Sequence, residues 1–184
     1  MGRVRGRPGD GAAAERDRIA DLSRVGGISP LGAQVLLNRG VTDPAQARAF
    51  LDARLNGLND PEGLPGVVDA ADRLVRAIRE DRPIVIYGDY DVDGVCGVSV
   101  LWAALKLAGA KRVDYYIPHR VQEGYGVNPD AIRKIAADNP GALVVTVDCG
   151  ISAVAEARLA RELGLEFIVT DHHTIGPELP TADV

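Results

Sequence analysis

Sulfur and aromatic side chains are scarce in this sequence of 184 residues. It has two cysteines, Cys96 and Cys149, and neither belongs to a Cys-x-x-Cys pair, which excludes a disulfide framework and argues against structural zinc. Aromatic residues make up 4% of the chain, so we expect a core of Ala, Val, Leu and Ile packed between helices and a sheet. Cys96 lies in an apolar helical stretch and is expected in the core. Cys149 has no assigned base and is expected to be a small buried residue rather than a nucleophile.

Long apolar runs are also lacking. The longest, from Gly94 to Ala110, is interrupted by Lys106 and falls short of the roughly 20 residues of a membrane span. The N-terminus has no apolar stretch of the secretory kind, so we expect a cytoplasmic protein without a membrane partner. The net charge of −5 argues against affinity of the whole surface for nucleic acid. A local basic groove or bound cations could still attract phosphate.

Three regions differ in their patterning. Residues 1–14 mix Arg, Gly, Ala and Pro without a period, which predicts a disordered lead. Residues 15–66 carry interrupted helical signals, such as the N-cap and first-turn proline Asp43-Pro44 before a helix over 45–51. From residue 67 to 184, helical and strand patterns alternate.

That alternation predicts an α/β fold. We expect helices near 71–78, 95–107, 129–137 and 152–163, and strands at 84–87, 113–117, 143–147 and 167–170. Strands separated by helices form βαβ units with a parallel sheet, and strands rich in Val and Ile are buried on both faces. The predicted fold class is therefore a parallel sheet flanked by helices, preceded by a small helical N-terminal segment.

Polar segments follow three of these strands. They are Gly88-Asp-Tyr-Asp-Val-Asp-Gly94, Asp148-Cys-Gly150 and Asp171-His-His173. Each alone fits a turn, a helix cap or a solvated loop. Because parallel strands end at one edge of the sheet, we expect the three segments to meet in one crevice, where crowded carboxylates are tolerated mainly with cations or protons. The sequence therefore predicts a metal site.

The residue types favour Mn²⁺, with Mg²⁺ or Zn²⁺ less well matched, because the ligands are carboxylates and imidazoles without a thiolate. Asp91 and Asp93 would point to one side of an extended segment, and Asp148 is the candidate bridge between two ions. Two metals about 3.5–4 Å apart activate water against a phosphodiester and stabilise the leaving oxygen. Phosphodiester hydrolysis is therefore the predicted chemistry.

In this order the segments resemble the DHH phosphoesterase superfamily, and within it the RecJ-like family of bacterial single-strand-specific 5′→3′ exonucleases. Further similarity lies in Ile84–Val95, in Pro118-His-Arg-Val-Gln-Glu-Gly-Tyr-Gly-Val-Asn128, in Val145–Gly150 and in the helical lead at 36–43, 49–51 and 58–61. The resemblance implies that manganese is bound by Asp91, Asp93, Asp148 and His172, with Asp89 a further member of the cluster. It implies two ions in the complete enzyme.

The resemblance also implies substrate contacts. His173 would face the scissile phosphate or position the attacking water, and with Asp148 it forms the expected catalytic pair. Arg120 would contact phosphate, although a surface pairing with Glu123 is the alternative. Tyr125 would offer a stacking face to a base or serve as a packing residue.

The family continues, beyond the length of this chain, with a further metal-binding aspartate, a DHH-associated second domain and an oligonucleotide-binding domain. From their absence in these 184 residues we expect little or no nuclease activity from this chain alone. The implied role is single-stranded DNA degradation in repair and recombination, by a monomer whose partners include a single-strand-binding protein or a helicase. Two alternatives stay open: a phosphoesterase of short oligonucleotides or cyclic dinucleotides, and a non-catalytic scaffold.

Overall fold

The chain divides between Asp60 and Pro61 into two compact units, each described here by itself. The computed structural model describes residues 10–52 and 54–184. Of the lead expected to be disordered, residues 1–9 lie outside the described residues, and the first helix begins at Asp10. Within the described ranges, no helix combines the length and apolar character that crossing a membrane requires.

The first unit consists of helices α1 (Asp10–Gly26), α2 (Pro30–Asn38) and α3 (Pro44–Asp52), followed by a 3₁₀ turn, η1 (Leu55–Gly57). The helix expected over 45–51 is confirmed, and the Asp43 carboxylate accepts a hydrogen bond from the backbone N–H of Gln46 at 2.9 Å. A proline in the first turn fits because its missing N–H has no partner to lose there. A small core joins the three helices through Leu22, Ala33, Leu36 and Ala47.

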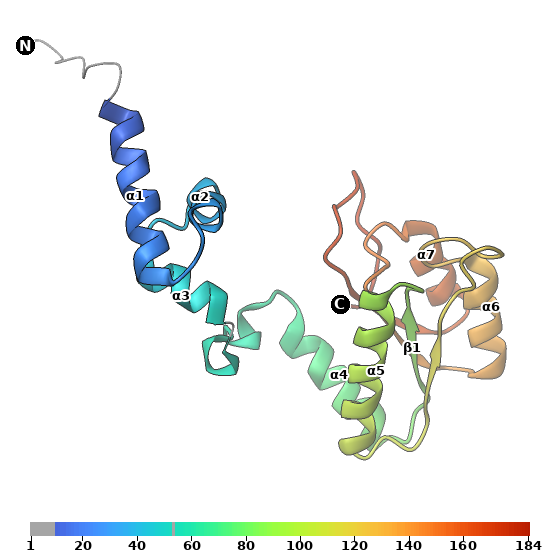
Figure 1. The fold of residues 1–184 in the computed structure, drawn as a ribbon. Coiled ribbons are helices and arrows are strands. Elements are labelled where there is room, and N and C mark those ends of the chain that lie inside the picture. Colours follow the sequence, from blue (N-terminus) through green and yellow to red (C-terminus); the bar gives the residue numbers. More distant parts are fainter. Residues whose placement is uncertain (1–9, 53) are drawn as a thin grey trace, which may run out of the picture. The chain divides into compact units, whose positions relative to one another are not determined.

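The second unit is the α/β fold predicted from the sequence (Figure 1). After the 3₁₀ turn η2 (Pro61–Gly63) its elements are α4 (Val67–Arg79), β1 (Ile84–Gly88), α5 (Val92–Leu107), β2 (Val113–Tyr116), α6 (Pro129–Asp138), β3 (Leu143–Val147), α7 (Val154–Glu162) and β4 (Glu166–Thr170). The four strands are parallel in the order β2-β1-β3-β4. β1 and β3 are therefore central, and β2 is an edge strand.

Each face of the sheet is covered by its own pair of helices (Figure 1). Alternate side chains of a strand point to opposite faces. Val85, Tyr87, Val144 and Phe167 pack with the small and apolar residues of α6 and α7, whereas Ile84, Ile86, Val145 and Ile168 pack toward α4 and α5. The burial of the Val- and Ile-rich central strands on both faces is confirmed.

Helix α5 differs from the expectation in two respects. It begins at Val92 rather than near Val95, and much of its surface is exposed, including Cys96, whose predicted place in the core is wrong. The reason is that α5 touches the sheet along one side, through Gly94, Val98 and Leu105. The rest of this apolar helix faces outward in the second unit.

Glu166, the first residue of β4, joins three segments at the amino ends of the strands. Its carboxylate accepts hydrogen bonds from Arg73 of α4, at 2.6 Å, and from Arg82, which precedes β1. Arg82 also donates to the carbonyl oxygen of Gly141, before β3, at 2.6 Å. These contacts fix the end of the sheet opposite the polar segments.

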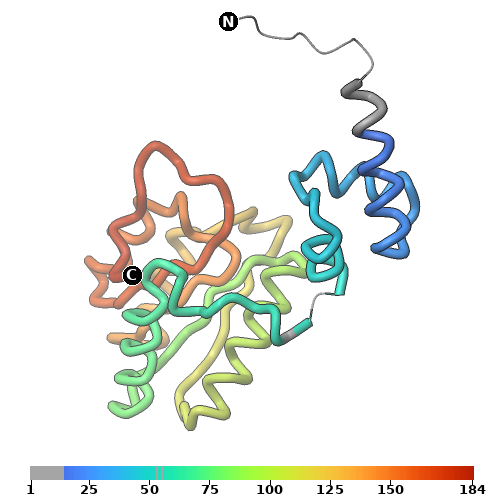
Figure 2. Tube along the Cα trace, turned by 90° about the vertical axis from the view of Figure 1, so that its left-hand side faces the viewer, coloured from blue at the N-terminus to red at the C-terminus, as the bar shows by residue number. Residues whose placement is uncertain are grey.

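After β4 the chain loops outward and returns to the edge of the same strand, which Figure 2 shows as the large red loop of the trace. Two backbone hydrogen bonds hold the C-terminal residues against β4. The N–H of Val169 donates to the carbonyl oxygen of Val184, and the N–H of Asp183 donates to the carbonyl oxygen of Phe167. The loop begins with the Asp171-His172-His173 segment, so this segment belongs to a loop that is anchored at both ends.

Candidate metal centre

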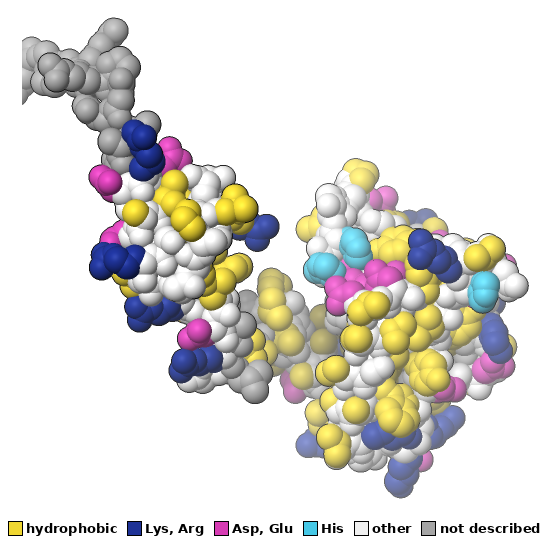
Figure 3. Space-filling model, viewed as in Figure 1, with side chains coloured by type: hydrophobic (Ala, Val, Ile, Leu, Met, Phe, Trp, Pro, Cys, Tyr) yellow, Lys and Arg dark blue, Asp and Glu magenta, His cyan; other side chains and the backbone are white. Residues whose placement is uncertain are grey.

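Three aspartates stand at one level at the carboxyl edge of the sheet. Gly88 of β1 pairs in register with Val147 of β3, which pairs with Thr170 of β4, so the next residue of each strand is Asp89, Asp148 or Asp171. This edge is also the point where the chain direction across the sheet reverses, between β1 and β3, the usual ligand site of such sheets. Acidic and histidine side chains gather together on this unit in Figure 3.

Two groups of possible ligand atoms share Asp148. The first is Asp89, Asp91 and Asp148, and the second is Asp148, His172 and His173, with the ligand atoms of each group within 4.8 Å of one another. The structure thus brings together residues from three separate segments. A carboxylate common to two groups of ligands has the placement that a bridging ligand requires.

Asp89 has a buried carboxylate oxygen that lacks a hydrogen-bond partner among the described residues. The residue is 2% exposed, and the unpartnered atom is its Oδ1. A buried carboxylate oxygen without a partner is costly, because it has lost its hydration and gained nothing in return. A cation next to this oxygen would remove that cost.

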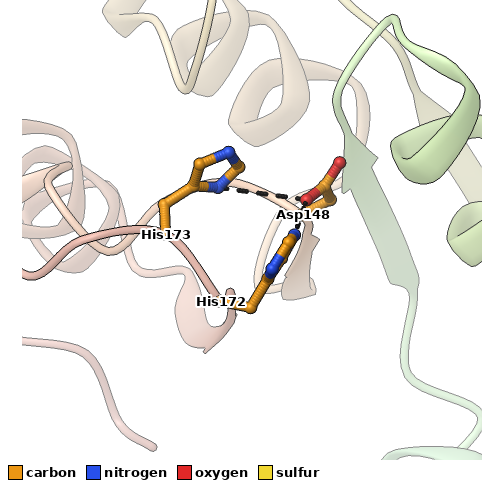
Figure 4. Close-up of side chains that lie close together, drawn as sticks. All are labelled: Asp148, His172 and His173. Carbon is orange, nitrogen blue, oxygen red and sulfur yellow. Dashed lines mark hydrogen bonds and ion pairs between the residues drawn. The ribbon is translucent and has the colours of Figure 1, made fainter. Parts of the chain in front are cut away.

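Asp148 is held in an unusual conformation. Its φ of 63° is in the left-handed region, which aspartate tolerates better than most residues. Its Oδ1 atom lies 2.9 Å from Nε2 of His172 and 3.9 Å from Nδ1 of His173, as Figure 4 shows. Burial raises the pKa of Asp148, the charges of Asp93 and Asp91 raise it further, and the His172 hydrogen bond opposes both. The surroundings of Asp148 therefore resist its negative charge.

The extended backbone that the sequence analysis expected for Asp91 and Asp93 is found at Asp91 but not at Asp93, which lies in the first turn of α5. Asp91 is the N-cap of α5, and its Oδ1 atom accepts hydrogen bonds from the backbone N–H groups of Asp93 and Gly94 at 2.9 and 3.0 Å. Hydrogen bonding from Gly94 first, and from Asp93, lowers the pKa of Asp91 against the effect of burial. The expectation fails at Asp93 because Asp91 caps a helix whose first turn contains Asp93.

Asp93 consequently stands beside the two groups rather than within them. Its Oδ2 atom lies 3.5 Å from Nε2 of His172, and its side chain is exposed. Gly94 places the helix start close to the strand end. A Cβ atom on Gly94 would lie 2.6 Å from the carbonyl oxygen and 2.7 Å from the nitrogen of Asp89, so the backbones approach as only glycine permits.

The sequence analysis assigned no role to Asp171. Its side chain is 1% exposed and accepts hydrogen bonds from the backbone N–H groups of Ile151, His172 and His173 and from Nδ1 of His173, at 2.7 Å. Burial raises the pKa of Asp171, but these hydrogen bonds outweigh it, so the pKa is lowered. The hydrogen bond between the Asp171 carboxylate and the His173 ring raises the pKa of His173. The available signal was a carboxylate directly at a strand end before two histidines.

Arg120 and Tyr125 lie on the loop between β2 and α6. The guanidinium carbon of Arg120 is 5.2 Å from the centroid of the Tyr90 ring, within the range of a cation–π contact. In the part of the chain that the structure describes, the Glu123 carboxylate accepts hydrogen bonds from Tyr116, His119 and Asn128, and no ion pair joins it to Arg120. The Tyr125 hydroxyl lies 3.2 Å from Nδ1 of His173, and Tyr125 is 55% exposed.

The donor set fits a hard divalent cation of the Mn²⁺ type. It consists of carboxylate oxygens and imidazole nitrogens, and Cys149 contributes no thiolate because burial raises its pKa to about 12. Cys149 is fully buried, which confirms that it is a small core residue. The unpartnered Oδ1 of Asp89 is the second reason that the residues fit a metal ion.

The comparisons with known proteins cover most of this chain. The sequence model described as "DHH family, N-terminal domain" matches residues 83–184. Among curated relatives, the single-stranded-DNA-specific exonuclease RecJ of Bacillus subtilis is 45% identical over 166 residues, which are 90% of this chain and 21% of that protein. RecJ of Escherichia coli is 36% identical over 92% of this chain and 28% of its own length. The chain thus spans about a quarter of the length of these relatives.

Two solved structures extend the similarity to the fold. A crystal structure of exonuclease RecJ bound to manganese is 43% identical with a TM-score of 0.60, over 65% of this chain and 30% of that one. The crystal structure of RecJ from Thermus thermophilus, in complex with Mn²⁺, is 30% identical with a TM-score of 0.63, over 90% of this chain and 22% of that one. The family match covers more than half of the chain and includes every grouped carboxylate and imidazole, so this chain belongs to the DHH family and its relatives are RecJ exonucleases.

Proposed function

We propose that this chain is the metal-binding N-terminal part of a phosphodiesterase that degrades single-stranded DNA from its 5′ end. The observation that carries the proposal is the buried Oδ1 atom of Asp89, which lacks a hydrogen-bond partner in the described structure and belongs to a group with Asp91 and Asp148. Manganese in the two related crystal structures supports the choice of ion. The strand-end placement of all three segments supports the hydrolytic chemistry.

We assign the metal ligands to Asp89, Asp91, Asp93, Asp148 and His172, with Asp148 shared between two ions. Bound manganese would supply a nucleophilic hydroxide at neutral pH and stabilise charge on the phosphate oxygens. Asp91 and Asp148 are oriented in advance, one by backbone hydrogen bonds and the other by its left-handed turn. Preorganised ligands lose little conformational entropy when an ion binds.

The remaining residues bind and orient substrate in this proposal. Asp171 holds Nδ1 of His173, which leaves Nε2 as the atom that meets a phosphate oxygen or the attacking water. Arg120 supplies a guanidinium, suited to bidentate contact with phosphate. Beside His173, a cavity of about 520 Å³ lined by Tyr125, Gly150, Ser152 and neighbouring residues has room for a nucleotide.

Single-stranded DNA is the proposed substrate because both curated relatives are named as single-stranded-DNA-specific exonucleases. A role in DNA repair or recombination is the corresponding proposal. In RecJ the matched segment is about a quarter of the chain, so we expect the isolated 184 residues to bind metal and to hydrolyse DNA slowly or not at all.

The test has a binding arm and a hydrolysis arm. Isothermal titration with Mn²⁺ should show binding that is lost in Asp148→Asn. With protein in excess over DNA labelled at the 5′ phosphate, the expected product is labelled mononucleotide, in small yield and only with Mn²⁺. Absence of Mn²⁺ binding would refute the proposal. A ladder shortened from the 3′ end, or preferential cleavage of a cyclic dinucleotide, would refute the substrate assignment.

A further inference from the structure

Glu123 is the centre of a hydrogen-bond network within the loop that joins β2 to α6, residues 117–128. Its Oε2 atom accepts the backbone N–H of His119 at 2.6 Å. Its Oε1 atom accepts the hydroxyl of Tyr116 and the side-chain amide of Asn128, the latter at 3.2 Å. One carboxylate thus ties the end of β2, the middle of the loop and the N-cap of α6 together. These hydrogen bonds lower the pKa of Glu123, and the one from the backbone N–H of His119 has the largest effect.

A buried tyrosine anchors the same loop from the sheet. The hydroxyl of Tyr87, on β1, donates to the carbonyl oxygen of Gly126 at 3.0 Å and accepts from the backbone and side-chain amides of Asn128 at 3.3 Å. The ring of Tyr87 stacks on that of Tyr116 with centroids 5.3 Å apart. The loop is therefore fixed on both sides of Tyr125 by contacts to the sheet and to α6.

Tyr125 reaches the candidate centre from this fixed loop. Its neighbours Gly124 and Gly126 have φ values of 80° and 84°, which only glycine adopts without strain, and these turn the chain on either side of Tyr125. The Tyr125 hydroxyl lies 3.2 Å from Nδ1 and 3.4 Å from Nε2 of His173, and the two rings meet edge to face at 5.6 Å. His173 is therefore held between the buried Asp171 carboxylate and Tyr125.

We infer that Glu123 and Tyr125 are positioning residues for His173: the Glu123 network fixes the loop, and the Tyr125 hydroxyl fixes the orientation of the His173 ring. The resemblance to the family gave Glu123 no role in the site, and it left Tyr125 with two alternatives, a stacking face for a base or a packing residue. The inference gives both residues one task, the orientation of His173. The inference rests on the proposed function only for the step at which His173 meets substrate. The orientation of the ring is a property of the protein by itself.

The first experiment measures that orientation without DNA. The sequence has three histidines, so the ring signals of His173 can be resolved by NMR with ¹⁵N-labelled histidine, at constant pH with chelator present. Tyr125→Phe removes the hydroxyl and keeps the ring. Glu123→Gln keeps the size of the side chain but replaces one of its two acceptor oxygens with an amide NH₂ group. The donors that bind both carboxylate oxygens in the wild type then have a single acceptor oxygen. Both variants should shift the His173 ring signals, and the double variant should shift them no further than Tyr125→Phe alone.

Glu80→Gln is the matched control, because Glu80 is an exposed residue at the C-terminal end of α4, before the amino end of β1. It should leave the His173 signals unchanged. If Glu123→Gln fails to fold, Tyr125→Phe still tests the inference, because deleting one exposed oxygen atom should leave the fold intact. Unchanged His173 signals in Tyr125→Phe would overturn the inference.

The second experiment connects orientation to substrate. Mn²⁺ affinity should be unchanged in both variants, whereas kcat for release of 5′ mononucleotide, in a longer version of the enzyme that is active, should fall about tenfold with KM nearly constant. A rise in KM alone for Tyr125→Phe would overturn the positioning role in favour of substrate binding. If a longer wild-type version also failed to hydrolyse DNA, the proposed function would be refuted, and the NMR result would still judge the positioning of His173.

Discussion

Asp89 and Asp148 stand side by side on the two central strands, each one residue beyond the register pair Gly88 and Val147. Asp89 is buried with an unpartnered oxygen, and Asp148 is buried with a raised pKa. Two carboxylates placed in this way repel each other, and the fold supplies no lysine or arginine to either of them among the ion pairs of the described residues. The pair is therefore destabilising unless a cation is bound or one carboxylate takes up a proton.

The first prediction concerns the shared carboxylate. Asp148→Asn should weaken Mn²⁺ binding by about a hundredfold or more, because it removes the one ligand common to both groups. Asparagine is the appropriate replacement, since it tolerates the left-handed backbone of residue 148 as aspartate does. Isothermal titration measures the change. Asp72→Asn, at an exposed position on α4, should bind Mn²⁺ as the wild type does, and equal affinities for both variants would contradict the assignment.

The second prediction concerns the contact between α5 and β1. Gly94→Ala should destabilise the second unit by about 1–3 kcal/mol, because the added Cβ would overlap the backbone of Asp89. It should also weaken Mn²⁺ binding by displacing Asp89. Urea denaturation and metal titration provide the two measurements. Gly63→Ala introduces a Cβ with nothing within 4 Å and should change stability by less than about 0.5 kcal/mol.

The third prediction uses the opposite end of the sheet. Burial raises the pKa of Glu166, but Arg73 and Arg82 outweigh it, so the folded-state pKa lies below the unfolded value near 4.5. A lowered carboxylate pKa stabilises the fold above the unfolded pKa, and this stabilisation is lost as the pH falls through the folded pKa. Glu166→Gln should therefore cost about 1–3 kcal/mol at pH 7, and the difference should shrink below about pH 4.

Urea denaturation of wild type and Glu166→Gln across this pH range gives the measurement. The matched control is Glu80→Gln, whose stability should follow that of the wild type at each pH. A difference for Glu166→Gln that stays constant between neutral and acidic pH would show that the ion pairs with arginine do not carry the effect.

The fourth prediction concerns the two thiols. Cys96 is exposed on α5, whereas Cys149 is fully buried and burial raises its pKa to about 12. A thiol reagent such as DTNB should therefore modify one cysteine in the native protein and both in guanidinium. Fast modification of both in the native state would show that the β3–α7 segment opens readily.

Much of the fold follows from the sequence because the strands are short apolar runs with clear boundaries. The runs at 84–87 and 143–147 were found for this reason, and the polar residues directly after them share one edge by parallel topology. The helix start at Asp43-Pro44 follows from capping chemistry, and the structure confirms the cap.

Where the sequence-based prediction failed, tertiary contacts decide the outcome. Asp93 was expected in an extended segment with Asp91, but the close approach of Gly94 to Asp89 lets α5 begin directly after Asp91. Asp171 received no role because its burial and the hydrogen bond it accepts from the backbone N–H of Ile151, a residue distant in sequence, arise only in the folded chain. The exposure of Cys96 could not be found from hydropathy, since α5 is apolar on the side that faces away from the sheet as well.

Every grouped carboxylate and imidazole belongs to the unit that begins at Pro61, while residues 10–60 have a separate hydrophobic cluster around Leu22 and Leu36. Substitutions in the two units should therefore have different effects on metal binding. A cavity cut into the helical cluster alters a part of the protein in which the described residues hold no grouped ligand. Loss of DNA cleavage from such a change, with Mn²⁺ affinity unchanged, would show that the leading helices contribute to cleavage by a route other than metal binding.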